Sequence, residues 1–511
     1  MSPQATFDCD LLVIGGGING AGIARDAAGR GLRVILCEQH DLASHTSSAS
    51  TKLIHGGLRY LENYEFGLVR KALREREVLL RSAPHIMGPL RFVMPHWHEQ
   101  RPAWLIRSGL FLYDHLARRV LLPASESLAL AKHPSGRGLQ ARFGRGFAYS
   151  DGWVDDARLV VLCAMAAAER GAQVLTRHRV EHLADCGDGW QAGIRAANGT
   201  TLRVRARAAV NAAGPWATRL PDVPLPPGRS LRLVKGSHIV VPRLFAHDYA
   251  YLFQQPDERV VFAIPYEHDF TLIGTTDVDY AGDPAKVGID DAEIQYLCDA
   301  VNRFAERRLA PSDVVWHYAG VRPLLDDHAA SASATTRDYL LEWQPAAPPL
   351  IHVLGGKLTT FRQLAEDVVD RLAPRLGNTV GAWTRQAPLP GGDNLLANGP
   401  HVRNVLHFGD WVEQQGQRYP WLPAALLHRY ARAYGSRLHT LLAHCEGRAD
   451  LGDAVLPGLH VRELEYLRRH EWARTADDIL WRRSKLGLHL PASATATLQD
   501  WLDRNRLEGL T

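Results

Sequence analysis

The chain has 511 residues, of which 46% are hydrophobic and 22% are charged, so its composition is that of a globular protein and not of a disordered or fibrous one. Its 59 Lys and Arg residues against 55 Asp and Glu residues give a net charge of +4, too small for this length to indicate nucleic-acid binding. The length exceeds one typical core and predicts two or three domains.

The start of the chain is predicted to form a strand at residues 11–14, a helix that continues to about residue 31, and a second strand at residues 33–38. Gly15, Gly17 and Gly20 form a G-x-G-x-x-G loop between the first strand and the helix. Backbone N–H groups and the helix dipole at such a loop can hold a pyrophosphate, and Glu38 can accept a hydrogen bond from a ribose hydroxyl. This order of features favours a dinucleotide site over a plain packing turn, without distinguishing FAD from NAD.

A basic amphipathic helix is predicted at residues 102–122, after another basic stretch at residues 66–81. Apolar side chains recur at helical spacing with arginines alongside: Trp104, Leu105, Phe111, Leu112 and Leu116, and Arg101, Arg107, Arg118 and Arg119. Such a helix can lie in a bilayer interface with its arginines on anionic head groups. The alternative is a helix that packs against its own domain. We expect residues 101–122 to contact an anionic lipid surface.

Four further strand-like runs follow, at residues 208–211, 237–241, 260–264 and 271–275, and some of them are expected to form a separate sheet. A Pro/Gly cluster at residues 387–392 indicates a domain boundary. Beyond it, residues 424–442 and 461–486 are rich in Leu, Arg and Ala and predict a helical tail.

Residues 46–61 read TSSASTKLIHGGLRYL. This stretch closely resembles the flavin-contacting stretch of the FAD-dependent, quinone-linked glycerol-3-phosphate dehydrogenases. Matches continue in order at residues 149–151, 153–158, 211–216, 235–238, 273–277, 320–324 and 355–360, and in the tail at residues 471–474 and 477–483. The resemblance covers nearly the whole chain and implies non-covalent FAD, sn-glycerol 3-phosphate as substrate and membrane quinone as electron acceptor. An NAD-linked dehydrogenase would leave residues 46–61 and Lys357 unexplained.

The fold implied by this resemblance is α/β: an FAD-binding Rossmann-like domain, a β-rich cap domain for substrate of the flavoprotein amine-oxidase type, and an α-helical C-terminal domain. Residues 1–387 would interleave the first two domains, and residues 388–511 would form the third. The FAD-binding parts are expected at about residues 1–80, 150–230 and 345–387, and the cap parts at about residues 81–149 and 231–344.

The nucleotide fingerprint and the resemblance together give the residues expected to contact FAD: Gly15, Gly17, Ile18, Asn19, Gly20, Glu38, Thr46, Ser47, Ser50, Lys52, Leu53, His55, Gly56, Gly57, Ala213, Gly214, Trp216, Gly356, Lys357, Leu358 and Thr359. No metal site is expected, because the six cysteines show neither a C-x-x-C pair nor zinc spacing. Scattered cysteines of this kind suggest reduced thiols.

Cationic side chains are the candidates for holding the substrate phosphate, because a phosphate dianion is best bound by several positively charged donors. The candidates are Arg59, Tyr60, Arg322, Arg337 and Lys357. Arg59 and Tyr60 lie in an uncharged glycine-rich loop, which favours a ligand contact over a surface cation. Lys357 follows two glycines at an apparent helix start, where it can serve the reduced flavin, the phosphate or both.

Oxidation of a secondary alcohol requires a hydride acceptor and a base for the hydroxyl proton. His238 is the first candidate base, with a satisfied core histidine as the alternative reading, and His55 is the rival base. Arg322 can stabilise the developing alkoxide, so we treat His238 and Arg322 as a joint catalytic pair, with Lys357 as a third candidate. Thr275 and Thr276 are expected to position substrate or to order the site, although threonine is also common in strands.

Attachment to a membrane is expected to be peripheral, at the cytoplasmic face of the inner membrane. The longest apolar run, residues 159–168, is well short of the ~20 residues that span a bilayer. Residues 11–24 lack a preceding Lys or Arg and so do not form a signal peptide. A homodimer is one expected assembly. The alternatives are a glycerol-3-phosphate oxidase that uses oxygen and, from another class, a flavin-containing protein that binds or modifies nucleic acid.

Overall fold

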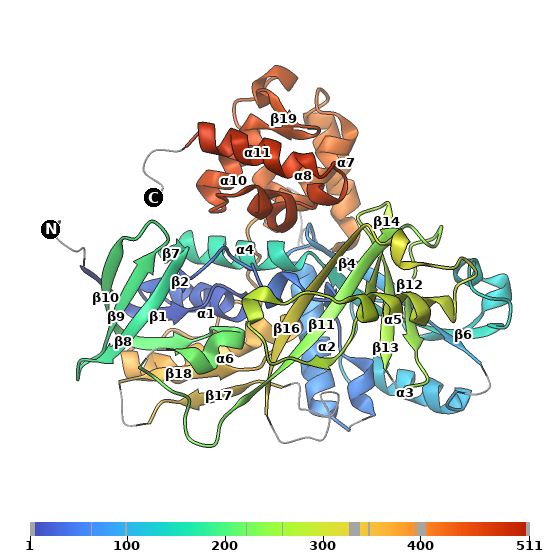
Figure 1. The fold of residues 1–511 in the computed structure, drawn as a ribbon, viewed down its shortest axis with the longest axis horizontal. Coiled ribbons are helices and arrows are strands. Elements are labelled where there is room, and N and C mark those ends of the chain that lie inside the picture. Colours follow the sequence, from blue (N-terminus) through green and yellow to red (C-terminus); the bar gives the residue numbers. More distant parts are fainter. Residues whose placement is uncertain are drawn as a thin grey trace.

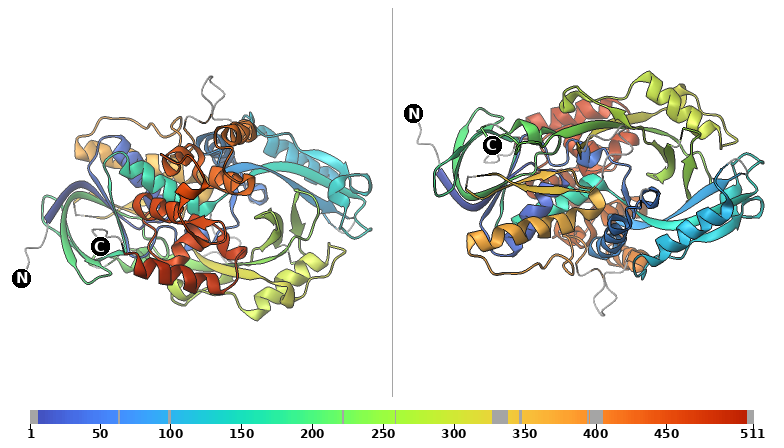
Figure 2. Two further views of the ribbon diagram at one scale, coloured as in Figure 1. Left: turned by 90° about the horizontal axis from the view of Figure 1, so that it is seen from above. Right: turned by 90° about the horizontal axis from the view of Figure 1, so that it is seen from below.

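The computed structural model describes residues 6–62, 64–97, 100–220, 222–257, 259–326, 338–345, 348–393, 395 and 405–506. These residues form two large β-sheets and a helical domain that lies over the junction between them (Figure 1). Views from above and below show that the body carrying the two sheets is elongated, with the helical domain over its middle (Figure 2).

The first sheet has a parallel core. β1 (Thr6–Ile14) pairs in parallel with β10 (Thr201–Asn211) on one side and with β2 (Val34–Glu38) on the other. The strand order is β17-β18-β10-β1-β2-β7, with the hairpin β8–β9 attached to β10. The remaining bounds are β7 (Gln173–Thr176), β8 (His178–Asp185), β9 (Trp190–Ala196), β17 (Leu340–Trp343) and β18 (Leu350–Leu354). Where strands of the parallel core are covered on both faces, their sequences are apolar, as at residues 11–14, 34–37 and 208–210.

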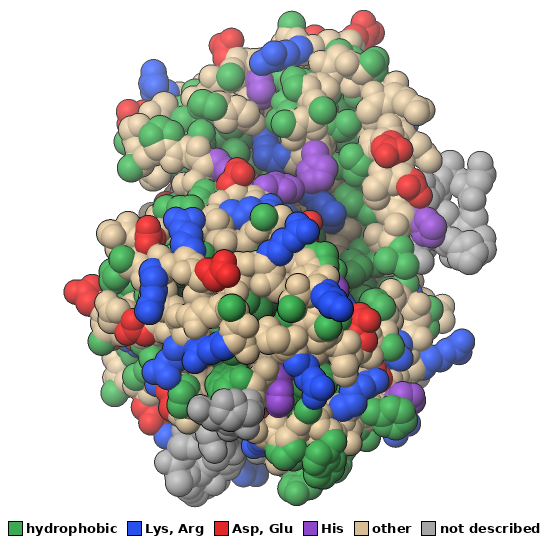
Figure 3. Space-filling model, turned by 90° about the vertical axis from the view of Figure 1, so that its right-hand side faces the viewer, with side chains coloured by type: hydrophobic (Ala, Val, Ile, Leu, Met, Phe, Trp, Pro, Cys, Tyr) green, Lys and Arg blue, Asp and Glu red, His purple; other side chains and the backbone are tan. Residues whose placement is uncertain are grey.

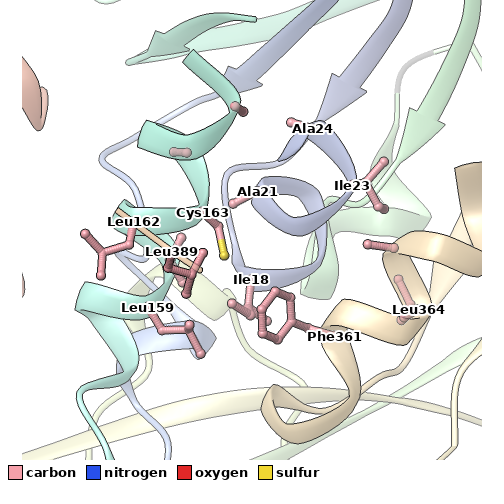
Figure 4. Packing of buried hydrophobic residues seen from close by; sticks show 14 of the residues in the cluster. Ile18, Ala21, Ile23, Ala24, Leu159, Leu162, Cys163, Phe361, Leu364 and Leu389 are labelled. Atoms are coloured by element: carbon pink, nitrogen blue, oxygen red, sulfur yellow. The ribbon is translucent and has the colours of Figure 1, made fainter. Parts of the chain in front are cut away.

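Three helices pack together over this sheet: α1 (Ile18–Gly29), α4 (Asp156–Ala168) and α6 (Phe361–Leu372). Side chains of α4 and α6 approach α1 from two sides (Figure 4). A Cβ atom added at Gly22 of α1 would lie 2.7 Å from the Phe361 ring, so the small residues of α1 allow this close contact. The packing fixes the N-terminus of α1 relative to the sheet.

The second sheet is mostly antiparallel, with the strand order β15-β11-β14-β13-β12-β4-β6-β3, and with β16 paired to β11 and β5 to β6. Its strands are β3 (Leu53–Ile54), β4 (Met87–His96), β5 (Glu126–Ala129), β6 (Arg145–Val154), β11 (Leu231–Pro242), β12 (Ala250–Gln254), β13 (Val260–Tyr266), β14 (Phe270–Gly274), β15 (Val278–Asp279) and β16 (Trp316–Leu325). Helix α5 (Asp291–Asn302) packs on the face that carries Ile239 and Val241. Helices α2 (Phe66–Ser82) and α3 (Ala103–His115) pack on the face that carries Val240.

The C-terminal domain is largely helical, as predicted. It contains α7 (Phe408–Arg418), α8 (Ala424–Tyr434), α9 (Leu438–Leu441), α10 (Val461–His470), a π-helical segment (Asp478–Arg483), α11 (Ser493–Arg504) and a short hairpin of β19 (Ala454–Leu456) and β20 (Leu459–His460). Two buried ion pairs attach it to the first sheet and its helices. Arg158 of α4 pairs with Glu471, and Arg483 donates to both carboxylate oxygens of Asp41 at 2.7 and 2.8 Å.

The predicted strands and the first helix are confirmed, whereas three predicted helices are shorter than expected. The stretch 424–442 is interrupted at Gly435, where φ is +52°, and the stretch 461–486 is interrupted after α10, where Trp472 has φ of +56°. Helix α3 ends at His115, not at residue 122, because the backbone N–H groups of Val120 and Leu121 donate to the Glu77 carboxylate instead of continuing the helix. The residue boundaries of the domains stay a prediction.

None of the helices in the described ranges combines the length and the apolar composition needed to cross a membrane. Within the same ranges, no group of three or more His, Cys, Asp and Glu side chains is arranged to hold a metal ion. All six cysteines have free thiols.

Candidate active site

A cavity of about 630 Å³ lies between the first sheet and the second, and residues of both line it. Its wall runs from Gly15 and Glu38, at the carboxyl ends of β1 and β2, to Gly236 and Arg322 on β11 and β16. The carboxyl end of a parallel sheet is where ligands of this fold class bind. The cavity is therefore placed to receive a nucleotide at one end and a second, reacting molecule at the other.

The backbone of the glycine loop packs closely against α1 and against the residues that follow β10. Gly15 has φ of +112°, and a Cβ atom there would lie 2.4 Å from the carbonyl oxygen of Ala212. A Cβ atom at Gly20 would lie 1.8 Å from the carbonyl oxygen of Gly15. The N-cap residue Gly17 has no side chain to cap α1, and the backbone N–H of Ile18 donates to the Ser47 hydroxyl at 3.0 Å. Gly17, Ile18 and Asn19 line the cavity. A helix N-terminus at the wall of a cavity is a site for an anion such as a pyrophosphate.

Glu38 lies beside this loop and is nearly buried. Its carboxylate accepts hydrogen bonds from the backbone N–H groups of Gly16 at 2.6 Å and His40 at 2.7 Å. Burial raises the pKa of Glu38 to about 7. Because the residue also lines the cavity, the carboxylate is in reach of a hydroxyl group bound there, as the ribose prediction requires.

The segment 44–57 forms the middle of the cavity wall and is tied to both sheets. The Thr46 hydroxyl donates to the carbonyl of Val321 on β16 at 2.7 Å. The Ser50 hydroxyl donates to Asp156 of α4 at 2.6 Å, and the Lys52 ammonium approaches the same carboxylate at 2.8 Å. Lys52 does not line the cavity; its side chain is buried and directed at Asp156. The Lys52 side chain thus pairs with Asp156, and its expected contact with FAD stays a prediction.

A group of polar and cationic side chains gathers at the other end of the cavity. Tyr60, Arg322, Lys357 and His55 all line it. The Lys357 ammonium lies over the Tyr60 ring, 3.8 Å from its centroid. The Arg322 guanidinium donates to the Thr275 hydroxyl at 3.0 Å and forms an ion pair with Asp277. This end of the cavity suits an anionic ligand.

His238 lies one step behind the cavity wall. Its side chain is fully buried, is stacked on Tyr318 with ring centroids 4.8 Å apart, and places Nε2 3.0 Å from the hydroxyl of Thr51, which lines the cavity. Nδ1 has no hydrogen-bond partner among the described residues. Burial, together with the charges of Arg322 and Lys52, holds the pKa of His238 well below its usual value. The imidazole is therefore neutral at physiological pH.

The chain matches two known sequence families. Residues 10–362 match the family described as FAD dependent oxidoreductase, and residues 382–503 match the C-terminal domain of alpha-glycerophosphate oxidase. A glycerol-3-phosphate dehydrogenase of Pseudomonas aeruginosa is 52% identical, with 96% of this chain and 94% of the relative covered. The aerobic glycerol-3-phosphate dehydrogenase of Escherichia coli is 47% identical, with 96% and 97% covered.

The chain belongs to the family of FAD-dependent glycerol-3-phosphate dehydrogenases. Its resemblance to this family is thereby confirmed. A D-erythritol 1-phosphate dehydrogenase of Brucella abortus is also 49% identical, with 98% of each chain covered. Among solved structures, the glycerol-3-phosphate dehydrogenase from Bacillus halodurans complexed with FAD has a TM-score of 0.77 at 28% identity, and the match covers 97% of this chain and 90% of that one. The fold class is confirmed as well.

The cavity of this FAD-dependent dehydrogenase fits a dinucleotide, because the glycines at the N-terminus of α1 allow a ligand to approach the backbone there. Most residues expected to contact FAD line it: Gly15, Gly17, Ile18, Asn19, Glu38, Thr46, Ser47, Ser50, Leu53, His55, Ala213, Gly214, Trp216, Gly356, Lys357, Leu358 and Thr359. Gly20, Gly56 and Gly57 lie just behind the wall, as Lys52 does. These contacts stay predictions for the bound state.

The expected substrate residues are only partly brought together. Tyr60, Arg322 and Lys357 share the cavity wall, whereas Arg59 and Thr275 do not line it. Thr275 lies directly behind the wall, in contact with Arg322. Arg337 lies outside the described residues.

Two residues of the site were missed by the sequence analysis. Asp156 anchors the segment 44–57, and Thr51 separates His238 from the cavity. Thr51 lies in the motif at residues 46–61 and Asp156 in the motif at residues 153–158, but neither motif indicates the contacts that these two side chains make.

Substitution of Gly20 by Ala is expected to weaken FAD binding, because the added methyl group would displace α1 from Gly15. Overpacking of this kind costs about 1–3 kcal/mol, equivalent to roughly 5- to 150-fold in affinity. The flavin retained per protein after purification, and the dissociation constant of added FAD, measure the effect. Gly67→Ala is the matched control, because Gly67 is also helical and a Cβ atom there meets no atom within 4 Å. Equal FAD binding by the two variants would contradict the assignment of the loop.

Proposed function

We propose that the chain oxidises the secondary alcohol of sn-glycerol 3-phosphate to dihydroxyacetone phosphate and passes the electrons to membrane quinone. The observation that carries the proposal is one cavity that extends from the N-terminus of α1 to the cationic end formed by Arg322 and Lys357. The names of the relatives from Pseudomonas aeruginosa and Escherichia coli support the substrate. When bound, FAD supplies the acceptor for the hydride that leaves the alcohol carbon.

The cationic end would bind the phosphate of the substrate. Lys357 offers a point charge beside the Tyr60 ring, and Arg322 offers a planar donor set. Gly355 and Gly356 have φ values of +78° and +100°, and this turn carries Lys357 to the wall. Arg59 and Arg337 remain proposed phosphate ligands on the basis of the sequence. An anion held here leaves its secondary alcohol near the middle of the cavity.

His238 and Arg322 would handle the hydroxyl group together. A neutral imidazole can accept the proton, and its Nε2 lies 3.0 Å from the hydroxyl of Thr51, through which the proton would pass from the cavity. Arg322 would stabilise the negative charge that develops on the oxygen. His55 remains the rival base because it lines the cavity directly, and burial also lowers its pKa.

Reduction of the bound flavin by substrate tests the proposed reaction. The purified protein is mixed anaerobically with sn-glycerol 3-phosphate while the flavin absorbance is followed, and a soluble quinone is then added. We expect bleaching and then reoxidation by quinone. Efficient reoxidation by oxygen alone would make the protein an oxidase, and absence of bleaching would refute the substrate. D-erythritol 1-phosphate is compared in parallel because the Brucella abortus relative is named for it.

Replacement of His238 by Ala is expected to lower the rate of flavin reduction by about 10²- to 10⁴-fold, with a smaller change in KM. The lowered pKa predicts that His238 carries no proton down to pH values well below 6.5. The wild-type rate should therefore not fall as the pH drops through about 6.5, the usual histidine pKa. His55→Ala is measured beside it. A large loss in that variant alone would assign the base to His55.

The exposed face of α3 is the proposed contact with a lipid surface. Trp104 and Phe111 are 70% and 57% exposed, and Leu105 and Leu112 lie beside them, whereas Leu116 packs toward the core. Hydrophobic side chains and basic side chains occur together at the lower edge of the face in Figure 3. Reduction of a lipid-soluble quinone would require such contact with a bilayer. The inner-membrane location and a homodimer remain part of this proposal.

Substitution of Trp104 and Phe111 by Ser is expected to weaken binding to anionic vesicles at least about tenfold, because a large apolar side chain contributes about 1.5–3 kcal/mol when fully buried. Sedimentation with phosphatidylglycerol vesicles measures the binding. Val380→Ser, which changes another exposed apolar residue, is the control and should bind like the wild type. Unchanged binding by the double variant would rule out α3 as the contact.

A further inference from the structure

Glu293 is a buried carboxylate that lies behind the cationic end of the cavity. It occupies the first turn of α5, and its side chain contacts β11 and the segment that follows β14. Oε1 accepts hydrogen bonds from the hydroxyls of Thr276 at 2.7 Å and Ser237 at 3.0 Å. Oε2 accepts from the backbone N–H of Asp290 at 3.2 Å and lies 2.8 Å from the Lys235 ammonium. The Glu293 carboxylate thus contacts two hydroxyls, one backbone N–H and one ammonium group.

The two oxygens of Glu293 serve different purposes. Oε2 belongs to the capping box of α5, in which the Asp290 side chain accepts from the Glu293 backbone N–H. Oε1 has no part in that cap; it holds Thr276, whose hydroxyl oxygen also accepts from the backbone N–H of Ser237 at 3.0 Å. The Thr276 hydroxyl is therefore fixed from both sides, and so is the backbone at residues 275–277.

This segment supplies three partners of the Arg322 guanidinium. Arg322 donates to the Thr275 hydroxyl at 3.0 Å and to the Thr276 carbonyl at 3.4 Å, and it pairs with Asp277. It also lies over Gly236, where a Cβ atom would be 2.3 Å from Nη2. Movement of the segment would therefore change the direction in which the guanidinium points into the cavity.

We propose that Glu293 is a positioning residue for the oxidation of the substrate, acting through Thr276 to aim Arg322 at the reacting oxygen. The inference rests on the proposed function, because it takes Arg322 as the group that stabilises the alkoxide. Electrostatic stabilisation of a transition state depends on donors fixed before the reaction, so an error in the direction of Arg322 reduces the rate more than it reduces the binding of FAD.

The rate of anaerobic flavin reduction by sn-glycerol 3-phosphate, per bound flavin, tests this role. Thr276→Val removes the hydroxyl and leaves the cap of α5 intact, and Glu293→Gln removes the charge. Both are expected to lower the rate about 10- to 100-fold, since a displacement near 1 Å at a reacting group has effects of that size. Thr276→Ser keeps the hydroxyl and should restore the rate to within about twofold of wild type. In an Arg322→Lys background, Glu293→Gln should add less than about a twofold loss, as expected for residues that act through one another.

Asp291→Asn is the matched control, because Asp291 is an exposed carboxylate in the same turn of α5. It should change neither the rate nor the FAD content. Unchanged rates per bound flavin in Thr276→Val and Glu293→Gln, with wild-type flavin still reduced, would overturn this inference and leave the proposed function standing. Failure of the wild-type flavin to be reduced would overturn the proposed function and this inference with it.

Discussion

The binding of the segment 44–57 by Asp156 is the interaction on which the site depends. The segment must cross from the first sheet to the second, where its end forms β3 against β6. Asp156 accepts from the Ser50 hydroxyl, pairs with Lys52 and accepts from the backbone N–H of Ala157, so its buried charge is compensated on several sides. Because α4 packs on α1, Asp156 also fixes the position of the cavity wall relative to the N-terminus of α1, the proposed site of the pyrophosphate.

The first turn of α4 connects the C-terminal domain to this wall as well. Asp155 caps α4 and contacts Lys485, and Arg158, one turn on, pairs with Glu471. Breaking a buried ion pair by removing one partner costs about 3–5 kcal/mol, while exchange of the whole pair for apolar residues can be neutral. These pairs therefore specify how the helical domain sits against α4 more than they add stability.

The parts of the fold that are local in sequence were predictable, and the parts that depend on distant residues were not. The strand, glycine loop and helix at residues 11–31 follow from apolar periodicity and from steric limits near Gly15 and Gly20. The burial of Lys52 against Asp156 joins residues 104 positions apart, and the burial of His238 beside Thr51 joins residues 187 positions apart. No local pattern encodes such contacts, so the sequence does not show that Lys52 pairs with Asp156 or that Glu293 holds Thr276.

The buried position of His238 makes its imidazole a weak base, and the cationic Arg322 at the substrate end would compensate for that weakness. Burial first, and then the charges of Arg322 and Lys52, lower the pKa of His238, which makes the imidazole available as a proton acceptor but also makes it a weak one. A weak base can accept a proton only from a group whose own acidity is raised to match. Arg322, placed at the same end, would lower the pKa of the bound hydroxyl by stabilising its alkoxide. In the proposed reaction this one guanidinium would act on both partners of the proton transfer, so its direction would matter more than its charge alone.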